Sequence, residues 1–266
     1  SLLAFNRPWN TPTAETVVDY QRQPPGLTED ETQIYNRMIV PKWLEELAPK
    51  DFLYDVQTAQ FAGQDLSDPK SLADIDLEFF ETLVFSRCNI GDSIERLSEL
   101  KQVKALYFWD STITDADCSH LSQVEQLNTL QIHSRNPQSP APTDLAISEL
   151  VKLQRLESLA LSGSDLTGDG LKQLAELPSL RMLDVSGTKL TNDDVQHLLA
   201  FPSLVVVNLL NTAVDEQSIE TLLKLPGEAS VRLTASSEAN KQAAEERLAN
   251  QPVDTQSNVW IQLESP

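Results

Sequence analysis

The sequence predicts an α/β fold, a right-handed solenoid with short parallel strands on a concave face and short helices on a convex face. The first observation is a repeat, because Leu156, Leu180 and Leu204 begin three similar units that are 24 residues apart. A constant period of this size is typical of solenoids. Upstream, spacings of 29, 24, 23 and 24 residues continue the register through Leu127, Val103, Phe80 and Val56.

The second observation is that two periodicities alternate within each unit. Leu183 and Val185 are two residues apart, as in a strand with one buried face, whereas Val195, Leu198 and Phe201 follow a helical spacing. Neither piece buries its apolar face alone, so stacked neighbours must form the core. We expect strands at residues 83–85, 106–108, 130–132, 159–161, 183–185 and 207–209, with residues 231–233 in phase.

A turn after each strand carries small hydroxyl or thiol side chains, which we expect to hydrogen-bond buried backbone groups. This turn ladder consists of Cys88, Ser111, Arg135, Ser164, Thr188, Thr212 and Ser236, and Arg135 breaks it in the 29-residue unit.

The helix starts follow the same register. Equivalent positions hold Thr114, Thr167, Thr191 and Asp215, which are all good N-cap residues. Thr114 with Asp117, and Thr191 with Asp194, have the spacing of capping boxes. A row of calcium ligands is the alternative for these acids, and we favour carboxylates that face the helix dipoles.

These units fit the leucine-rich-repeat template L-x-x-L-x-L-x-x-N/C-x-L. The string "LxxLxLSGTxLTxDxLxxLxxLPSL" resembles the 23–24-residue repeats of bacterial, planctomycete-type leucine-rich-repeat proteins, with Thr or Ser at the ladder position. The segment "VPKWLEELAPKDFLYDV" also resembles the stretch that precedes such arrays, so the resemblance covers about residues 40–235. It implies a recognition scaffold and leaves the partner open.

An open stack needs caps at both ends. We expect an extended arm at 1–27, a helical cap at 28–55, the solenoid at 56–235 and a C-terminal cap at 236–266. The N-terminal cap would contain a helix from Thr28, broken by Pro41, and a second helix near Trp43. In the C-terminal cap, "SSEANKQAAEERLANQ" predicts a helix and "NVWIQL" a strand that covers the last coil. The alternative is a strand offered to a partner.

Composition limits the partners. The chain has 20 basic and 40 acidic residues, a net charge of -20, which argues against nucleic acid or anionic lipid as a ligand. Two cysteines give no disulfide framework, and no run is long and apolar enough to span a membrane. The sequence begins at Ser1 without Met, which leaves room for an upstream signal or membrane anchor. We expect a periplasmic or envelope-associated location rather than a cytoplasmic one.

The sequence offers no catalytic set. His120, His133 and His197 have no zinc-ligand spacing, and no phosphate-binding or nucleophile motif occurs. Cys88 and Cys118 fall at inward positions, where they should be buried and inert. We therefore expect no enzyme activity, no metal and no cofactor.

The candidate site is the concave face of the predicted sheet. Asp184 is the single charged residue among the eighteen outward positions of the six strands, so this face is neutral. Aromatic anchors with few charges are typical of protein-contact surfaces. We expect a partner protein to bind at Tyr107, Trp109, Gln131, His133 and Arg135, beside an insertion at 134–144 that should protrude as a loop.

Three alternatives remain at this point. Small outward side chains are also favoured simply by closely spaced strands, and Trp109 could be the local core of the insertion. In function, the alternative to a recognition scaffold is a structural subunit of a larger, membrane-associated assembly. It would be held through its N-terminal arm and C-terminal strand.

Overall fold

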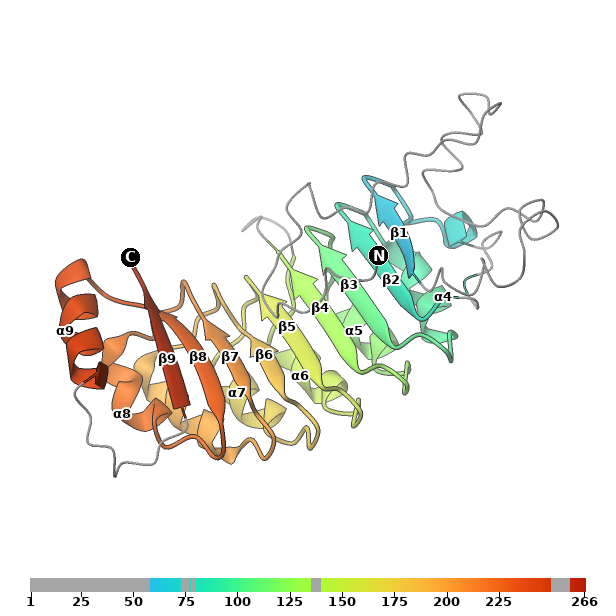
Figure 1. Cartoon of the computed structure of the whole chain (residues 1–266). Helices are drawn as coiled ribbons and strands as arrows, with labels where there is room; N and C mark the ends of the chain where they lie inside the picture. Colours follow the sequence, from blue (N-terminus) through green and yellow to red (C-terminus); the bar gives the residue numbers. More distant parts are fainter. Residues whose placement is uncertain (1–57, 73–76, 78–79, 135–139, 250–258) are drawn as a thin grey trace, which may run out of the picture.

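The protein forms one parallel sheet with short helices packed on one side (Figure 1). The computed structural model describes residues 58–72, 77, 80–134, 140–249 and 259–266. The nine strands lie side by side in chain order. They are β1 (Thr58–Ala62), β2 (Thr82–Ser86), β3 (Ala105–Trp109), β4 (Thr129–His133), β5 (Ser158–Ser162), β6 (Met182–Asp184), β7 (Val206–Leu209), β8 (Ala229–Thr234) and β9 (Val259–Glu264).

The helical segments alternate with the strands, as the period predicts. They are η1 (Pro69–Leu72), η3 (Gly91–Ser93), α4 (Ile94–Ser98), α5 (Asp115–Leu121), α6 (Asp144–Leu150), α7 (Gly168–Leu174), η4 (Asn192–Ala200), η5 (Glu216–Ser218), α8 (Ile219–Leu222) and α9 (Glu238–Ala249). We call the side of the sheet that faces away from these helices the concave face.

The predicted strand register is confirmed. Leu83, Leu106, Leu130, Leu159 and Leu183 are parallel partners across five neighbouring strands. The five extra residues of the long unit lie between β4 and β5, and they do not shift this register. The β6 strand ends at Asp184, one residue earlier than predicted.

Apolar side chains from all coils fill one continuous core. Phe61, Phe85 and Phe108 stack within it at ring-centroid distances of 5.0 and 5.2 Å, with nearly parallel planes. Ile132 and Leu161 continue the same row in register. Because each buried apolar side chain contributes about 1.5–3 kcal/mol, this repeated row is the main source of stability.

The turn ladder forms over much of the chain. Cys88 Sγ and Ser111 Oγ contact backbone carbonyl oxygens of the preceding coil, Phe61 O at 3.5 Å and Phe85 O at 3.1 Å. Thr188 and Thr212 donate instead to the carbonyl oxygens three residues earlier, both at 2.7 Å. Ser164 Oγ is buried without a hydrogen-bond partner among the described residues, in the coil that follows the insertion.

The expectation for Ser236 is wrong. This residue is exposed, and its Oγ donates to Glu216 Oε1 at 2.5 Å instead of entering the ladder. Glu216 lies on the helix side at the start of η5, and it also accepts from Asn240 in α9 at 2.9 Å. The chain leaves the repeat path at this point because these contacts direct it into the terminal helix.

The predicted N-caps are confirmed at Thr114, Thr167, Thr191 and Asp215, and Thr143 adds a fifth. At some of these caps, the preceding coil supplies an additional hydrogen-bond acceptor. Asp115, the first residue of α5, accepts from the backbone N–H and hydroxyl of Thr143 at 2.7 and 2.8 Å.

Two further contacts have the same geometry. Asp144, the first residue of α6, accepts from Thr167 N at 2.9 Å, and Asn192 Oδ1 accepts from Asp215 N at 3.0 Å. The first residue of one helix therefore stabilises the start of the next, which connects consecutive coils beyond their apolar contacts.

At Thr191 the arrangement changes because Gly168 begins the preceding helix and has no side chain. Thr191 N and Oγ1 both donate at 2.8 Å to Asp194, three residues later in the same coil. The Asp194 carboxylate fills the space that a side chain on Gly168 would need, since a Cβ there would lie 1.9 Å from Asp194 Oδ1.

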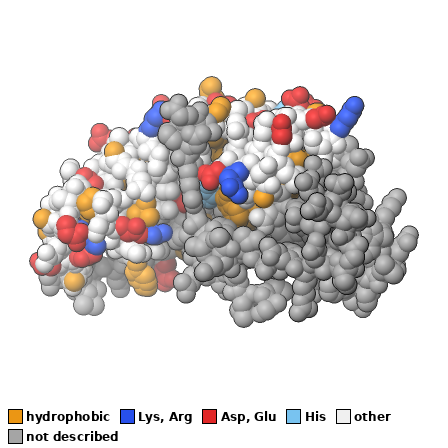
Figure 2. Space-filling view, turned by 90° about the horizontal axis from the view of Figure 1, so that it is seen from above, with side chains coloured by type: hydrophobic (Ala, Val, Ile, Leu, Met, Phe, Trp, Pro, Cys, Tyr) orange, Lys and Arg blue, Asp and Glu red, His pale blue; other side chains and the backbone are white. Residues whose placement is uncertain are grey.

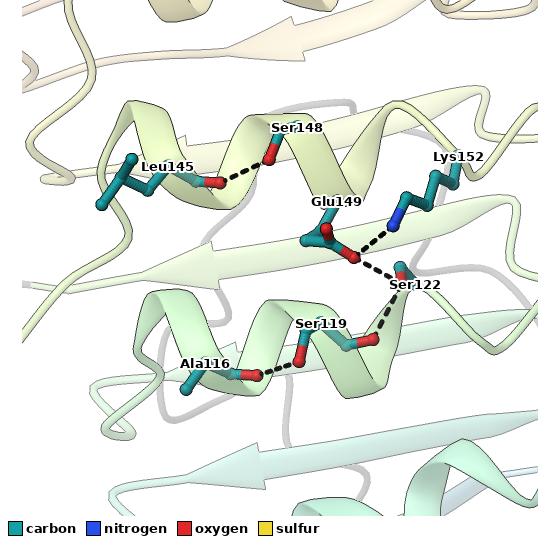
Figure 3. A network of polar contacts seen from close by, with 7 residues as sticks. All are labelled: Ala116, Ser119, Ser122, Leu145, Ser148, Glu149 and Lys152. Carbon is teal, nitrogen blue, oxygen red and sulfur yellow. Dashed lines mark hydrogen bonds and ion pairs between the residues drawn. The ribbon is translucent and has the colours of Figure 1, made fainter.

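The helix layer carries polar contacts at its surface, as Figure 3 shows for α5 and α6. Glu149 Oε2 accepts from Lys152 Nζ at 2.6 Å and from Ser122 Oγ of the neighbouring coil at 3.5 Å. Lys152 is exposed, so we assign such pairs little of the stability. Four of the described helical segments, η1, η3, η4 and η5, are 3₁₀-helices, and η4 is the longest of them with nine residues.

The C-terminal helix and strand occur as predicted. The helix α9 follows Ser237, whose Oγ accepts from Asn240 N at 3.2 Å. The β9 strand pairs with β8 in parallel over six residues and extends the sheet by one strand. Arg232 of β8 forms an ion pair with Glu264 of β9, and Trp260 is 66% exposed.

The expected N-terminal arm (1–27) and the helices near Thr28 and Trp43 lie outside the described residues. In the described part, no helix is long and apolar enough to cross a membrane.

Candidate functional site

The residues proposed from sequence come from two adjacent strands, β3 and β4. Tyr107 is the parallel partner of Gln131, and Trp109 is the partner of His133. All four side chains point to the concave face because the core-facing partners Leu106, Phe108, Leu130 and Ile132 alternate with them. We call these four residues the aromatic patch. Arg135, the fifth predicted residue, lies outside the described residues.

The four side chains contact one another. The rings of Tyr107 and Trp109 are tilted by 56° with centroids 5.7 Å apart, and His133 Nε2 lies 3.3 Å from Gln131 Oε1. All four are half-buried, and burial raises the pKa of the Tyr107 hydroxyl. The patch therefore presents partly exposed aromatic surface beside an amide and an imidazole, and it contains no Asp, Glu, Lys or Arg.

Two residues that the sequence analysis did not identify form backbone hydrogen bonds to the patch residues. Arg87 and Asp110 follow β2 and β3 directly and have left-handed backbones, with φ of 54° and 50°. Arg87 N donates to Trp109 O at 2.7 Å, and Asp110 N donates to His133 O at 2.8 Å. These bonds fix the backbones of the two outer patch residues.

A sequence signal for these two residues does exist. The equivalent position after β1 and β5 is glycine, Gly63 and Gly163, with φ of 64° and 74°. A left-handed conformation is unfavourable for non-glycine residues, more so for Arg than for Asp. Asn211, at the equivalent position after β7 and away from the patch, is also left-handed with a φ of 57°, so a non-glycine residue in this turn is not specific to the patch.

The other charged side chains on the described part of the concave face are either buried or ion-paired. Asp184 is only 6% exposed, and it accepts from Ser186 N at 2.9 Å and from Asn208 Nδ2 at 3.1 Å. The two charged residues further along, Arg232 and Glu264, neutralise each other. Charged side chains are spread over other parts of the molecule, as the view in Figure 2 shows.

The insertion is partly packed rather than fully protruding. Pro142 is buried, and its carbonyl oxygen accepts from Asp165 N at 3.0 Å in the next coil. Thr143 then caps α6. The C-terminal end of the insertion is thus attached to the solenoid, while residues 135–139 lie outside the described part.

Other reactive side chains lie in two further places among the described residues. Cys88 and Cys118 are buried free thiols, as predicted, and burial raises the pKa of both. An open groove of about 310 Å³ between α4 and α5 is lined by Asp92, Glu95, Asp117 and His120. Asp117 is already engaged by Thr114, and the described residues contain no group of three or more metal-binding side chains.

Among known proteins, matches to this chain come from solved structures. No family model matches the sequence, and no curated protein matches it. An internalin, InlF, from Listeria monocytogenes is 17% identical, with a TM-score of 0.47, over 76% of this chain and 57% of that one. The TLR13 chain of a complex with ssRNA13 is 20% identical, with a TM-score of 0.45, over 65% of this chain and 24% of that one.

This chain spans less than two thirds of either protein. The planctomycete-type resemblance stays a prediction. The fold itself rests on the period of the sequence, the nine parallel strands and the ladder of turn residues. By these three features the chain is a leucine-rich-repeat solenoid of the α/β class.

Proposed function

We propose that this protein is a non-enzymatic recognition scaffold that binds a partner protein through the aromatic patch on its concave face. The observation that carries the proposal is the pair Tyr107 and Trp109, half-exposed and in contact, on a face whose surface is otherwise neutral. Aromatic side chains supply large contact areas at low entropic cost, and binding hot spots are enriched in them.

The backbone of the patch is held by hydrogen bonds that recur along the solenoid, such as Gly63 N to Ser86 O at 2.8 Å. The carbonyl oxygens of Trp109 and His133 are held by two left-handed residues, so the patch is preorganised before any partner arrives. Preorganisation lowers the cost of ordering side chains on binding.

Charge distribution supports the same proposal. The net charge of -20 argues against a partner with an acidic surface, and the neutral patch argues against one that relies on ion pairs at its centre. The partner should therefore present an apolar or neutral centre, with basic residues tolerated at the rim. The alternative, a structural subunit of a larger assembly held through the arm at 1–27 and the C-terminal strand, makes no use of the aromatic patch.

The test compares Trp109→Ala with Met182→Ala, a matched removal of half-exposed apolar surface from the same face. A partner isolated by affinity capture on the wild-type chain is purified, and its dissociation constant for each variant is measured by calorimetry. We expect Trp109→Ala to weaken binding about thirtyfold or more, since loss of a hot spot costs roughly 2 kcal/mol, and Met182→Ala to bind normally.

Thermal unfolding of the same variants separates binding from packing. If Trp109→Ala lowers the melting temperature and leaves affinity unchanged, Trp109 is the local core of the insertion and the proposal is wrong. Trp109→Phe should recover most of the affinity, because it restores an aromatic side chain at the same place.

A further inference from the structure

Trp260 is an exposed aromatic residue on the same face as the aromatic patch. It lies in β9, where Val259 and Leu263 belong to the core and Trp260 alternates with them. Among the described residues, three large apolar side chains are exposed, Leu145, Leu199 and Trp260. The two leucines lie in α6 and η4, on the helix side. Trp260 is therefore the member of this set on the concave face, and it is 66% exposed.

The neighbouring strands cover little of the Trp260 side chain. Its parallel partner in β8 is Ser230, which is small and itself exposed. The next residue in the same row, Val206 of β7, is only half-buried. A tryptophan side chain can bury about 150–250 Å² of surface, so most of the area that Trp260 offers remains available for contact with another molecule.

The aromatic patch by itself is smaller than a stable protein interface. It consists of four half-buried residues, whereas a standard interface involves about 20–30 residues and roughly 800 Å² on each side. A circular surface of that area is about 30 Å across. Six strand spacings of about 4.8 Å separate β3 from β9 in the sheet, which is about 29 Å (Figure 1). A contact of ordinary size can therefore include both the patch and Trp260.

The apolar side chains beyond the patch lie toward the C-terminal end of the sheet. On the N-terminal side, β1 and β2 present small or polar side chains, such as Thr82 and Ser86, together with Val84, which is only 7% exposed. On the C-terminal side, Met182 is half-buried and Trp260 is exposed. An interface that extends from the patch over accessible apolar surface thus runs toward β9.

We propose that Trp260 is a second anchor for the partner protein that binds the aromatic patch, and that this partner is a folded protein whose surface covers the sheet from β3 to β9. This inference rests on the proposed function and adds the extent of the interface and the kind of partner. Contacts between the two anchors exclude water and contribute little individually. This agrees with the normal binding expected of Met182→Ala.

The surface between the two anchors favours a folded partner over an extended peptide. The strands from β3 to β8 each have a neighbour on both sides, so their backbone groups are used within the sheet rather than offered to a peptide strand. Two polar side chains in between are also engaged, because Asn208 Nδ2 donates to Asp184 Oδ2 at 3.1 Å and both residues are buried. Such a face is recognised through area and shape complementarity, which a folded surface provides.

The test measures the dissociation constant of Trp260→Ala by calorimetry, with the partner purified for the test of the proposed function. We expect about tenfold weaker binding, less than the loss for Trp109→Ala, because Trp260 lies at the margin of the contact. Leu145→Ala removes a side chain that is 75% exposed on the helix side and should leave the affinity unchanged. The double variant Trp109→Ala, Trp260→Ala should bind about three-hundredfold more weakly, because effects of distant residues multiply.

Hydroxyl-radical footprinting of the wild-type complex separates this inference from the proposed function. Protection of both Trp109 and Trp260 supports the second anchor. Protection of Trp109 alone, with unchanged affinity of Trp260→Ala, overturns the second anchor and leaves the proposed function in place. If Trp109 is not protected, the proposed function is wrong and the second anchor falls with it.

Two further results would also overturn the inference. A lower melting temperature of Trp260→Ala with unchanged affinity would assign Trp260 to packing of the terminal strand. A peptide from the partner that binds as tightly as the intact partner would contradict a folded partner, because it would place the whole contact within one extended segment.

Discussion

The hydrogen bonds at the helix starts lead to a quantitative prediction at Gly168 and Asp194. Asp194→Ala removes the acceptor of two hydrogen bonds from Thr191, both 2.8 Å long. Loss of a helix cap costs about 0.5–2 kcal/mol, so we expect the free energy of unfolding to fall by roughly 1–2 kcal/mol.

Gly168→Asp should have opposite effects in the two backgrounds. In the wild-type chain its Cβ would lie 1.9 Å from Asp194 Oδ1, and the resulting displacement should cost about 1–3 kcal/mol. In Asp194→Ala the carboxylate is gone, and the contact between the two Cβ atoms, at 3.2 Å, needs only a small shift. The introduced carboxylate can then accept from Thr191 as Asp144 does from Thr167.

Urea unfolding followed by circular dichroism gives the four free energies of this double-mutant cycle. We expect a coupling energy of about 1–3 kcal/mol, the range for residues that share a contact network. Gly168→Ala in the Asp194→Ala background is the control, because it adds the Cβ without the carboxylate and should not restore stability. Additive effects of the two substitutions would refute the reasoning.

Two further predictions concern the core and the thiols. Leu183→Ala should lower the free energy of unfolding by about 2–5 kcal/mol, because Leu183 is fully buried. Lys189→Ala should change it by no more than about 0.5 kcal/mol, because the side chains of its ion pair with Asp165 are 63% and 56% exposed. Equal melting temperatures of the two variants would show that the assigned phase is wrong. Cys118 should resist alkylation in the native chain, because burial first, and then the charges of Asp117 and Asp115, raise the pKa of its thiol. The pKa of this thiol is higher in the folded chain than in the unfolded chain. Its contribution to stability is therefore complete below the ordinary thiol pKa of 9.0 and is lost progressively as the pH rises above that value. Unfolding measured at pH 7 and at pH 10, with Cys118→Ser as the control, would detect this loss.

The repeat made the fold predictable. A period of 24 residues with alternating strand and helix spacing located six strands, and Leu183 pairs with Leu159 as its phase requires. The N-cap positions were equally accessible, because Thr at a fixed place before an apolar stripe is a local signal.

What the sequence could not show depends on contacts between coils. Ser236 leaves the ladder because Glu216, 20 residues earlier, binds it. Spacing alone could not separate the 3₁₀-helix η4 from the α-helices, since every coil places its apolar residues three apart. In the candidate site, the phase brought Tyr107 and Trp109 together with Gln131 and His133, but the depth of burial and the support from Arg87 emerge from the folded backbone.

The hydrogen bonds between consecutive helix starts divide the solenoid into two series of coils. Asp115 and Asp144 link α5, α6 and α7 into one series, Gly168 interrupts the series, and Asn192 begins another. Detachment of a coil on either side of a link breaks the same hydrogen bonds, so the coils of one series should detach together. Partial opening should therefore stop at the boundary between α7 and η4, where Gly168 provides no such link, so that the molecule behaves as two foldons.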